Sequence, residues 1–221
     1  DGVVDTSGYV PRVVRQSAEL LRDAVGRYVF VSSISVYDDF SEPIDESSPV
    51  AQLEDPATEE IMEAYGALKA AREDVVEEVY GERSARVRAG LIVGPFDPTD
   101  RFTYWPRRLA RGGEILAPAP ADEPVQFIDV RDLGDWLVDL LERRTAGAFN
   151  ATHPGVSWEE LLETCRDVTG SDATFRWVPD ELLQQHEVGE WMELPVWIAD
   201  PDEAALHETD VSRAVAAGLT F

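Results

Sequence analysis

The sequence predicts an α/β fold in which a parallel sheet flanked by helices is joined to a smaller mixed α+β module. In the first half, strand-like apolar runs alternate with helical patterns at the spacing of βαβ units. The run Arg27–Ser33 is apolar almost throughout its middle, as in a strand that is buried on both faces. After Gly94 the predicted elements become short and mixed. The sheet is therefore expected mainly in the first half and an irregular module in the second.

The first half is predicted to alternate strands and helices in order. Strands are assigned to short apolar runs, and helices to segments with apolar residues three and four apart. A polar loop with prolines and acidic residues fills Ser41–Pro56. The predicted elements are a strand at Val3–Asp5, a helix at Pro11–Val25, a strand at Arg27–Ser33, a helix at Ala57–Tyr80 and a strand at Arg86–Val93.

The second half is predicted to pack against the sheet with a cleft between the two parts. We divide the chain into residues 1–95, which carry the sheet, and residues 96–221, which are mainly the irregular module with segments that return to the sheet. The predicted elements after a turn-rich loop at Pro95–Phe102 are a short helix, a loop at Pro118–Pro124, strands at Val125–Val130, Ala148–Thr152 and Thr174–Val178, and helices at Arg131–Glu142, Trp158–Val168 and Pro179–Gln185.

The composition excludes several function classes. The 221 residues include 44 acidic and 19 basic side chains, a net charge of −25 that repels nucleic-acid backbones, so we expect no nucleic-acid partner. No apolar run approaches the roughly 20 residues that span a bilayer, so we expect a cytoplasmic protein without a membrane partner. The three histidines lack metal-ligand spacing, and no metal is expected. The single cysteine, Cys165, lies in a helical pattern and is expected to be a buried structural thiol.

The single lysine of the chain, Lys69, lies four residues after Tyr65. Residues four apart share one face of a helix. A nearby ammonium favours the phenolate of a tyrosine, which makes the phenol a usable acid or base near neutral pH. The pair is therefore a candidate proton-transfer site. A neighbouring Tyr/Lys pair on an ordinary surface helix is the alternative interpretation.

A serine at the end of the strand Arg27–Ser33 is a second candidate. The carboxyl ends of parallel strands face the crevice in which such sheets bind ligands. From there the Ser33 hydroxyl can orient a substrate oxygen, and we expect it within about 10 Å of the Tyr65 phenol if the two act together. A local turn that caps the strand is the alternative.

Five segments, taken together in order, resemble one known family. They are the strand and turn Val3–Gly8, the strand and serine Phe30–Tyr37, the Tyr-x-x-x-Lys of Tyr65–Lys69, the strand and exit Arg88–Pro95, and the strand–helix unit Gln126–Leu133. This set resembles the extended short-chain dehydrogenase/reductase family, also called NAD-dependent epimerase/dehydratases. The resemblance implies a Rossmann-like sheet, NAD or NADP as the cofactor and a small-molecule substrate. Residues 1–95 would then be the C-terminal part of the dinucleotide-binding domain and 96–221 mainly the substrate-binding module.

The resemblance also implies roles for individual residues. Tyr65 would be the general acid/base, Lys69 would support its phenolate and bind the nicotinamide ribose, and Ser33 would hydrogen-bond the reacting oxygen. The implied cofactor contacts are Thr6, Ser7, Gly8, Tyr65, Lys69, Ala89, Gly90, Leu91 and Ile92, and the implied substrate contacts are Ser35, Tyr37, Arg107, Arg108, Gln126 and Arg131.

The sequence departs from the family pattern in three places. It contains no Gly-rich phosphate turn, and because it opens inside a strand we expect the upstream strands, that turn and the NAD/NADP selector to be missing. Gln126 stands where sugar-nucleotide epimerases carry an arginine, and Ile34-Ser35 where dehydratases carry Asp-Glu. A small hydroxy or keto substrate is therefore favoured. A sugar-nucleotide epimerase or dehydratase, and a non-catalytic module that senses dinucleotide, are the alternatives, and a homodimer is left open.

The substrate pocket is expected to be walled by parts of the irregular half. These are the segment Phe96–Arg111, the strand Gln126–Asp129 and the aromatic segment Trp191–Trp197. An arginine cluster within the first of them is interpreted either as a solvated helix face or as part of a pocket for an anionic group. Its members are Arg101, Arg107, Arg108 and Arg111.

Overall fold

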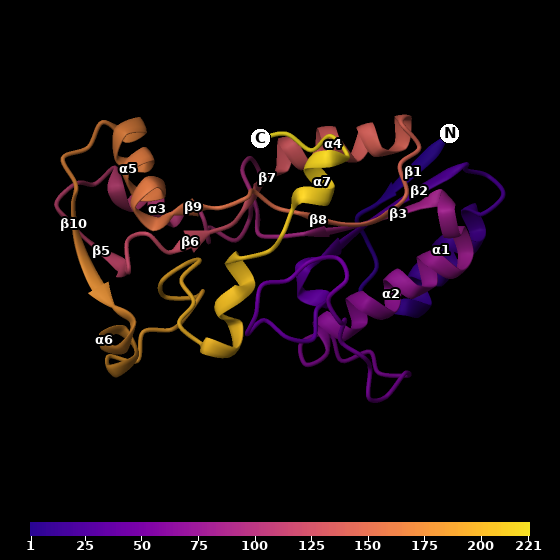
Figure 1. Ribbon diagram of the computed structural model, residues 1–221, viewed down its shortest axis with the longest axis horizontal. Coiled ribbons are helices and arrows are strands. Elements are labelled where there is room, and N and C mark those ends of the chain that lie inside the picture. The colour runs from indigo at the N-terminus through magenta and orange to yellow at the C-terminus, as the bar shows by residue number, and fades with distance from the viewer.

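A sheet of four parallel strands, three from the first half of the chain and one from the second, organises one part of the computed structural model, which describes residues 1–221 (Figure 1). The strands lie in the spatial order β1, β2, β3 and β8, and each neighbouring pair is parallel. The predicted α/β class with a Rossmann-like parallel sheet is therefore confirmed, and β1 lies at one edge of the sheet. The bounds are Gly2–Asp5 for β1, Arg27–Ser33 for β2, Ser84–Ala89 for β3 and Gly147–Ala151 for β8.

Helices cover both faces of this sheet (Figure 1). Successive side chains of a strand point to opposite faces, so Tyr28 and Phe30 of β2 pack against α1 and α2, whereas Val29 packs against α4. Because both faces are buried, the middle of β2 carries an almost unbroken apolar run. The helices are α1 (Pro11–Leu21), α2 (Tyr65–Tyr80), α4 (Val130–Glu142) and α7 (Ser212–Ala216).

The third strand is shorter than the sequence predicts. The pattern indicates one strand over Arg86–Val93, but β3 ends at Ala89 and Ile92–Val93 belongs to a different small sheet. The chain leaves the main sheet at Gly90, where a Cβ would lie 2.8 Å from the side chain of Thr152. Only glycine fits this close approach, and residues 90–92 line the clefts beside the strand ends.

Helix α2 begins at Tyr65, whereas the sequence predicts a helix from Ala57. In the preceding segment, side chains bond to the backbone: the Ala57 N–H donates to Asp55 Oδ1 at 2.9 Å, and the Glu60 N–H donates to Thr58 Oγ1 at 3.2 Å. Such local bonds compete with helix formation. Tyr65 therefore occupies the first turn of the helix.

The second half outside β8, α4 and α7 forms a module around a separate apolar cluster, in which three buried tryptophans take part: Trp105, Trp158 and Trp197. The predicted strand Val125–Val130 is two short strands, β6 and β7, because each pairs with a different partner. No strand is predicted at β5 (Glu114–Ala119), and a loop is predicted from Pro118 onward. β5 pairs only with β10 (Thr174–Pro179), and an edge strand tolerates the single proline. The division at residues 95 and 96 stays a prediction.

The remaining elements are short. They are β4 (Ile92–Val93), α3 (Tyr104–Leu109), β5 (Glu114–Ala119), β6 (Pro124–Val125), β7 (Ile128–Asp129), β9 (Val156–Ser157), α5 (Trp158–Thr169), β10 (Thr174–Pro179), α6 (Asp180–Gln185), and the 3₁₀ helices η1 (Ile34–Val36), η2 (Gly81–Arg83) and η3 (Pro201–His207).

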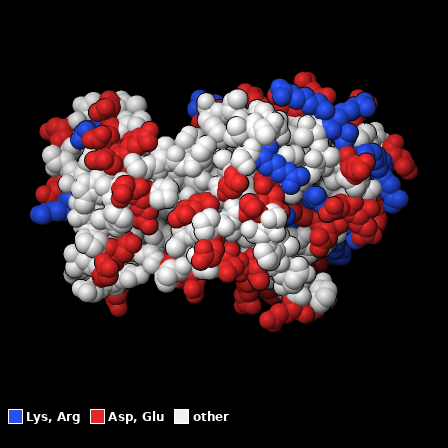
Figure 2. All heavy atoms as spheres, in the orientation of Figure 1, with Lys and Arg blue, Asp and Glu red and all other residues white.

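Acidic side chains dominate the surface. Figure 2 shows them along the whole visible face, while Lys and Arg gather mainly at the end that holds the four-stranded sheet. None of the helices is both long and apolar enough to cross a bilayer. The side chains of Cys, His, Asp and Glu form no group of three or more that could hold a metal ion.

Candidate functional site

Two clefts open beside the carboxyl ends of the main strands, and Tyr65 and Ile92 line both. We call them the strand-end cleft and the outer cleft. The strand-end cleft, of about 460 Å³, is lined by Thr6, Ser7, Gly8, Tyr9, Val31, Ser32, Tyr65, Lys69, Ile92, Val130, Leu133, Gly134 and Leu137. The outer cleft, of about 610 Å³, is lined by Ile34, Ser35, Phe40, Tyr65, Gly90, Leu91, Ile92, Arg101, Trp191, Glu203 and Leu206.

A third cavity, the arginine pocket, shares Arg101 and Trp191 with the outer cleft. It has a volume of about 440 Å³, and its lining includes Arg101, Arg107, Arg108, Arg111, Tyr104, Trp191 and Met192. The arginine cluster singled out in the sequence therefore faces a cavity.

Tyr65 is held at the junction of the two clefts by tight backbone packing. Its neighbour Gly66 lies so close to η1 that a Cβ would come 2.1 Å from the Ser35 carbonyl oxygen. Only glycine allows the start of α2 to approach η1 this closely. The Tyr65 side chain is 38% exposed, so its phenol is accessible from the clefts.

Lys69 lies one helical turn after Tyr65 and also lines the strand-end cleft. Its Nζ donates to the Val31 carbonyl oxygen at 3.0 Å and lies 5.4 Å from the centre of the Phe30 ring. Burial, followed by the charge of Arg72, lowers the pKa of Lys69 to about 8, although Glu73 and Asp5 oppose the shift. The ammonium group of Lys69 is thus poorly solvated, and it still has N–H donors for a ligand.

This shift can be measured directly, because Lys69 is the single lysine. After reductive methylation with ¹³C, we expect the lysine methyl signal to titrate near pH 8 in the folded protein and near 10.5 in denaturant. The unfolded chain retains a proton that the folded protein releases, so the contribution of Lys69 to stability rises with pH between these two values. The Lys69→Arg variant identifies the signal by its loss. A folded-state value at or above 10 would contradict the burial of the ammonium.

Ser33 ends β2 and caps the N-terminus of η1. Its Oγ accepts a hydrogen bond from the Ser35 N–H at 3.1 Å and donates to Ser35 Oγ at 3.0 Å. Ser35 lines the outer cleft together with Tyr65, whereas Ser33 is behind it and lines neither cleft. The capping turn is thus present, and the role of Ser33 toward a substrate oxygen stays a prediction.

The strand-end cleft fits the nicotinamide–ribose half of NAD or NADP. Val31, Ile92 and Leu133 provide apolar walls, and Lys69 provides ammonium donors beside them. The Oγ of Ser32 is buried without a hydrogen-bond partner in the protein, and a buried hydroxyl of this kind gains free energy from a polar ligand group. Among the implied cofactor contacts, Thr6, Ser7, Gly8 and Ile92 line this cleft, Gly90 and Leu91 line the outer cleft, and Ala89 is buried in β3.

Two implied substrate contacts lie away from the clefts. Tyr37 is buried, and its hydroxyl donates to Asn150 Oδ1 at 2.6 Å and accepts from Arg88 Nη1 at 2.9 Å. Gln126 is also buried and exchanges two hydrogen bonds of 3.0 Å with the backbone of Thr209. Both side chains therefore form hydrogen bonds that hold parts of the fold together.

The three implied arginine contacts differ in their surroundings. Arg131 is exposed, forms an ion pair with Asp129 and lines none of the three cavities. Arg107 and Arg108 line the arginine pocket, where Arg107 pairs with Asp100 at 2.9 Å and Arg108 donates to two backbone carbonyls.

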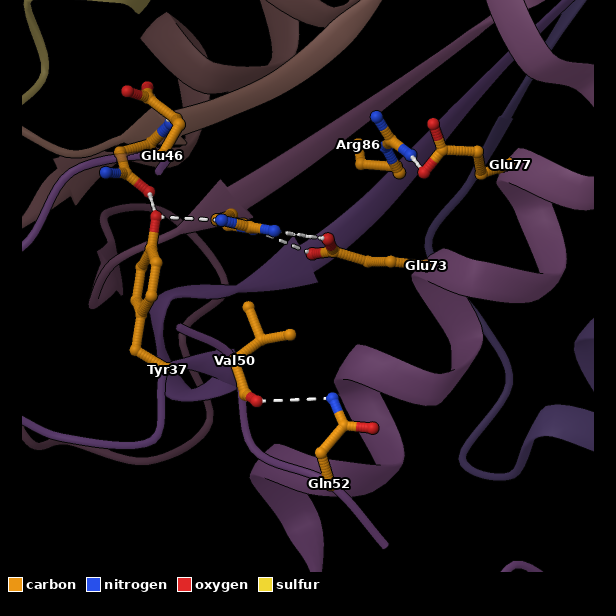
Figure 3. Close-up of polar contacts among 9 residues, drawn as sticks. Tyr37, Glu46, Val50, Gln52, Glu73, Glu77 and Arg86 are labelled. Carbon is orange, nitrogen blue, oxygen red and sulfur yellow. Dashed lines mark hydrogen bonds and ion pairs between the residues drawn. The ribbon is translucent and has the colours of Figure 1, made fainter. Parts of the chain in front are cut away.

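A buried ion pair ties α2 to β3 beneath the site (Figure 3). Nε and Nη2 of Arg88 donate hydrogen bonds to the Glu73 carboxylate, and the shortest of these is 2.8 Å. Burial opposes the charge on Arg88, but the hydrogen bonds and charge of Glu73 outweigh it, so the pKa of Arg88 is raised. The same guanidinium contacts Tyr37, and Asn150 extends the network to the Glu46 carboxylate at 2.8 Å.

Several residues that line or adjoin the clefts could not be recognised as site residues from the sequence. Phe40, Glu203 and Leu206 reach the outer cleft from a loop and from η3, which the sequence pattern does not assign to the site. No sequence pattern indicates a role for Arg72 of α2 either, although it is buried beside the strand-end cleft.

Comparisons with known proteins identify one matching family. The model of the NAD dependent epimerase/dehydratase family matches residues 12–151. No curated protein matches the chain.

Three solved structures show the shared fold. A human epimerase family protein with NADPH is 17% identical, with a TM-score of 0.62 over 100% of this chain and 77% of that chain. The UDP-N-acetylglucosamine 4-epimerase from Bacillus cereus is 18% identical (TM-score 0.60; 82% of this chain, 67% of that chain). A dTDP-4-dehydrorhamnose reductase from Clostridium acetobutylicum is 18% identical (TM-score 0.58; 82% and 66%), so the chain spans about two thirds of its length. The expectation of missing upstream strands gains no support from these matches.

Proposed function

The chain belongs to the NAD-dependent epimerase/dehydratase family, and we propose that it is an NAD(P)-dependent oxidoreductase or epimerase that acts on a small hydroxy or keto compound. The observation that carries the proposal is the position of Tyr65 between a cleft that fits the nicotinamide half and a second cleft open to a substrate. Lys69 lines the first of these clefts together with Tyr65 and places an ammonium group there.

In this mechanism the chain's own side chains position the substrate and move one proton. The phenol of Tyr65 gives a proton to a substrate carbonyl, or accepts one from a hydroxyl. Lys69, which lines the same cleft as Tyr65, would bind the nicotinamide ribose, while Ser33, together with Ser35 at the cleft surface, orients the reacting oxygen. NAD or NADP would supply hydride transfer in the strand-end cleft.

The lining of the outer cleft favours a partly apolar substrate with one negative group. Ile34, Phe40, Leu91, Trp191 and Leu206 give it mostly apolar walls. Of the arginines nearby, Arg101 lines both this cleft and the arginine pocket, and it forms no ion pair, since its Nε donates only to Thr99 Oγ1 at 3.1 Å. Arg101 is therefore our candidate for reading the negative group.

Substitution of Arg101 tests this assignment. We expect Arg101→Gln to raise KM for a keto-acid substrate by about 10- to 100-fold, because a charge-assisted hydrogen bond is lost, and to leave KM for a neutral ketone unchanged. Arg131→Gln is the control, since Arg131 lies outside the cavities. Equal losses with both substrates would contradict the assignment.

Two other functions remain to be distinguished by a substrate screen. A sugar-nucleotide epimerase or dehydratase would place its phosphates in the arginine pocket. A non-catalytic module would sense dinucleotide without turnover. We would test UDP-sugars and small aldehydes and ketones with both NADH and NADPH. Robust UDP-sugar epimerisation, unaffected by Arg101→Gln, would overturn our proposal in favour of the first alternative.

A further inference from the structure

Arg72 is a buried cation without a carboxylate partner. It is 1% exposed, and its guanidinium takes part in none of the ion pairs of the protein, in contrast to Arg88. Its Nη2 is buried with no hydrogen-bond partner in the protein. Burying a charge in this way is costly, and an apolar side chain of similar volume would fill the space at lower cost. The contacts that Arg72 does make therefore indicate its role.

Those contacts join the catalytic helix to a turn of the strand-end cleft. Arg72 Nε donates to the Leu68 carbonyl oxygen of its own helix at 2.9 Å, which fixes the orientation of the guanidinium. Nη1 donates to the Gly8 carbonyl oxygen, in the turn between β1 and α1. Gly8 lines the cleft with φ +87°, and a Cβ there would come 2.5 Å from Val14. The turn can thus adopt this path only with glycine.

The opposite side of the turn is held by Asp5. Its Oδ1 accepts from the Ser7 N–H at 2.8 Å and from the Ser7 hydroxyl at 2.7 Å, and Tyr28 donates to its Oδ2. A carboxylate from β1 and a guanidinium from α2 therefore hold three consecutive cleft-lining residues, Thr6–Gly8, from two sides.

We infer that Arg72 is a positioning residue, which fixes the turn Thr6–Gly8 in the strand-end cleft relative to Tyr65 and Lys69. The contact joins two parts of the site, because Arg72 lies one turn after Lys69 on α2 and Gly8 lines the strand-end cleft. Loss of the contact frees the turn while the sheet and the two catalytic candidates stay in place. The inference rests on the proposed function only in taking this cleft as the dinucleotide site.

Amide hydrogen exchange at Ser7 tests the inference without turnover. The Ser7 N–H is bonded to Asp5, so its exchange requires the turn to open. In the full chain we expect Arg72→Met to speed this exchange by about tenfold or more, and Arg72→Lys, which keeps a donor, to restore part of the protection. Amides of β2 and β3 should keep their rates. Arg83→Met is the matched control, since Arg83 also donates to backbone carbonyls beside α1, those of Arg22 and Val25, at the other end of that helix.

The outcomes separate the inference from the proposed function. Unchanged exchange at Ser7 in Arg72→Met, or a rise shared equally by the β2 amides or by Arg83→Met, overturns the inference. If Arg72→Met does not fold, the same comparison with Arg72→Gln decides.

In parallel, NADPH titration by fluorescence should show binding about tenfold weaker in Arg72→Met than in Arg83→Met. A wild-type protein that binds neither NADH nor NADPH refutes the proposed function, while the exchange rates still decide the role of Arg72.

Discussion

Replacing Tyr65 by phenylalanine is expected to lower kcat by about 10²- to 10⁴-fold, the usual contribution of a positioned acid/base. The phenol hydroxyl is the one group removed, and it makes no hydrogen bond within the protein, so neither folding nor cofactor binding should change. Turnover is measured with the substrate found by the screen, and NAD(P)H affinity by fluorescence titration. The expected pattern is lost turnover with an unchanged dissociation constant for the cofactor.

Tyr9→Phe is a matched control for this experiment. Tyr9 lines the same strand-end cleft and is 64% exposed, but it lies in the β1–α1 turn and not on α2. Tyr9→Phe should therefore keep kcat within about twofold, a change of less than 0.5 kcal/mol in the activation free energy. If Tyr65→Phe also keeps its turnover, the acid/base assignment is wrong. If the wild-type protein binds dinucleotide but turns over none of the compounds screened, the sensing module becomes the better interpretation.

The parts of the site that sequence could predict depend on local rules. Tyr65 and Lys69 share a cleft because they are four apart on a helix, and Ser33 ends a strand whose apolar run marks it as buried. The parallel direction of the strands follows from the alternation of strands and helices. None of these inferences requires knowledge of a distant partner.

The surroundings of Tyr37 and Gln126 could not be predicted in the same way, because distant partners decide them. The hydroxyl of Tyr37 is taken by Asn150, 113 positions away, and the amide of Gln126 by Thr209, 83 positions away. Nothing near either residue in the sequence indicates these partners. Likewise, an arginine in a helix is typical of the exposed face, and only the packing of α1 on α2 shows that Arg72 reaches Gly8.

Local rules also misplace the ends of elements. The start of α2 depends on competing bonds from Asp55 and Thr58, and the end of β3 on the contact between Gly90 and Thr152. These two boundaries matter for function, since one sets the position of Tyr65 and the other turns the chain so that Gly90 and Leu91 line the outer cleft. A helix that began at Ala57 would have placed Tyr65 in its third turn instead of its first.

The largest expected effect on stability comes from Glu73. Changing Glu73 to leucine leaves the guanidinium of Arg88 buried without its carboxylate, and breaking such a pair costs about 3–5 kcal/mol. The side chains of the pair are only 6% and 8% exposed, so water cannot replace the lost contact. Urea denaturation, followed by circular dichroism, measures the free energy of unfolding for each variant.

Glu77→Leu is the matched control, since Glu77 lies one turn further along the same helix and pairs with Arg86 (Figure 3). Its side chain is 61% exposed, so its loss should cost at most about 1 kcal/mol. The double variant Glu73→Leu with Arg88→Met removes both charges and should recover much of the stability, because apolar pairs of similar volume often replace buried ion pairs without loss. If Glu73→Leu costs no more than Glu77→Leu, the pair does not hold α2 on β3. If the double variant is stable but less active than wild type, the pair serves chiefly to orient α2, and with it Tyr65, on the sheet.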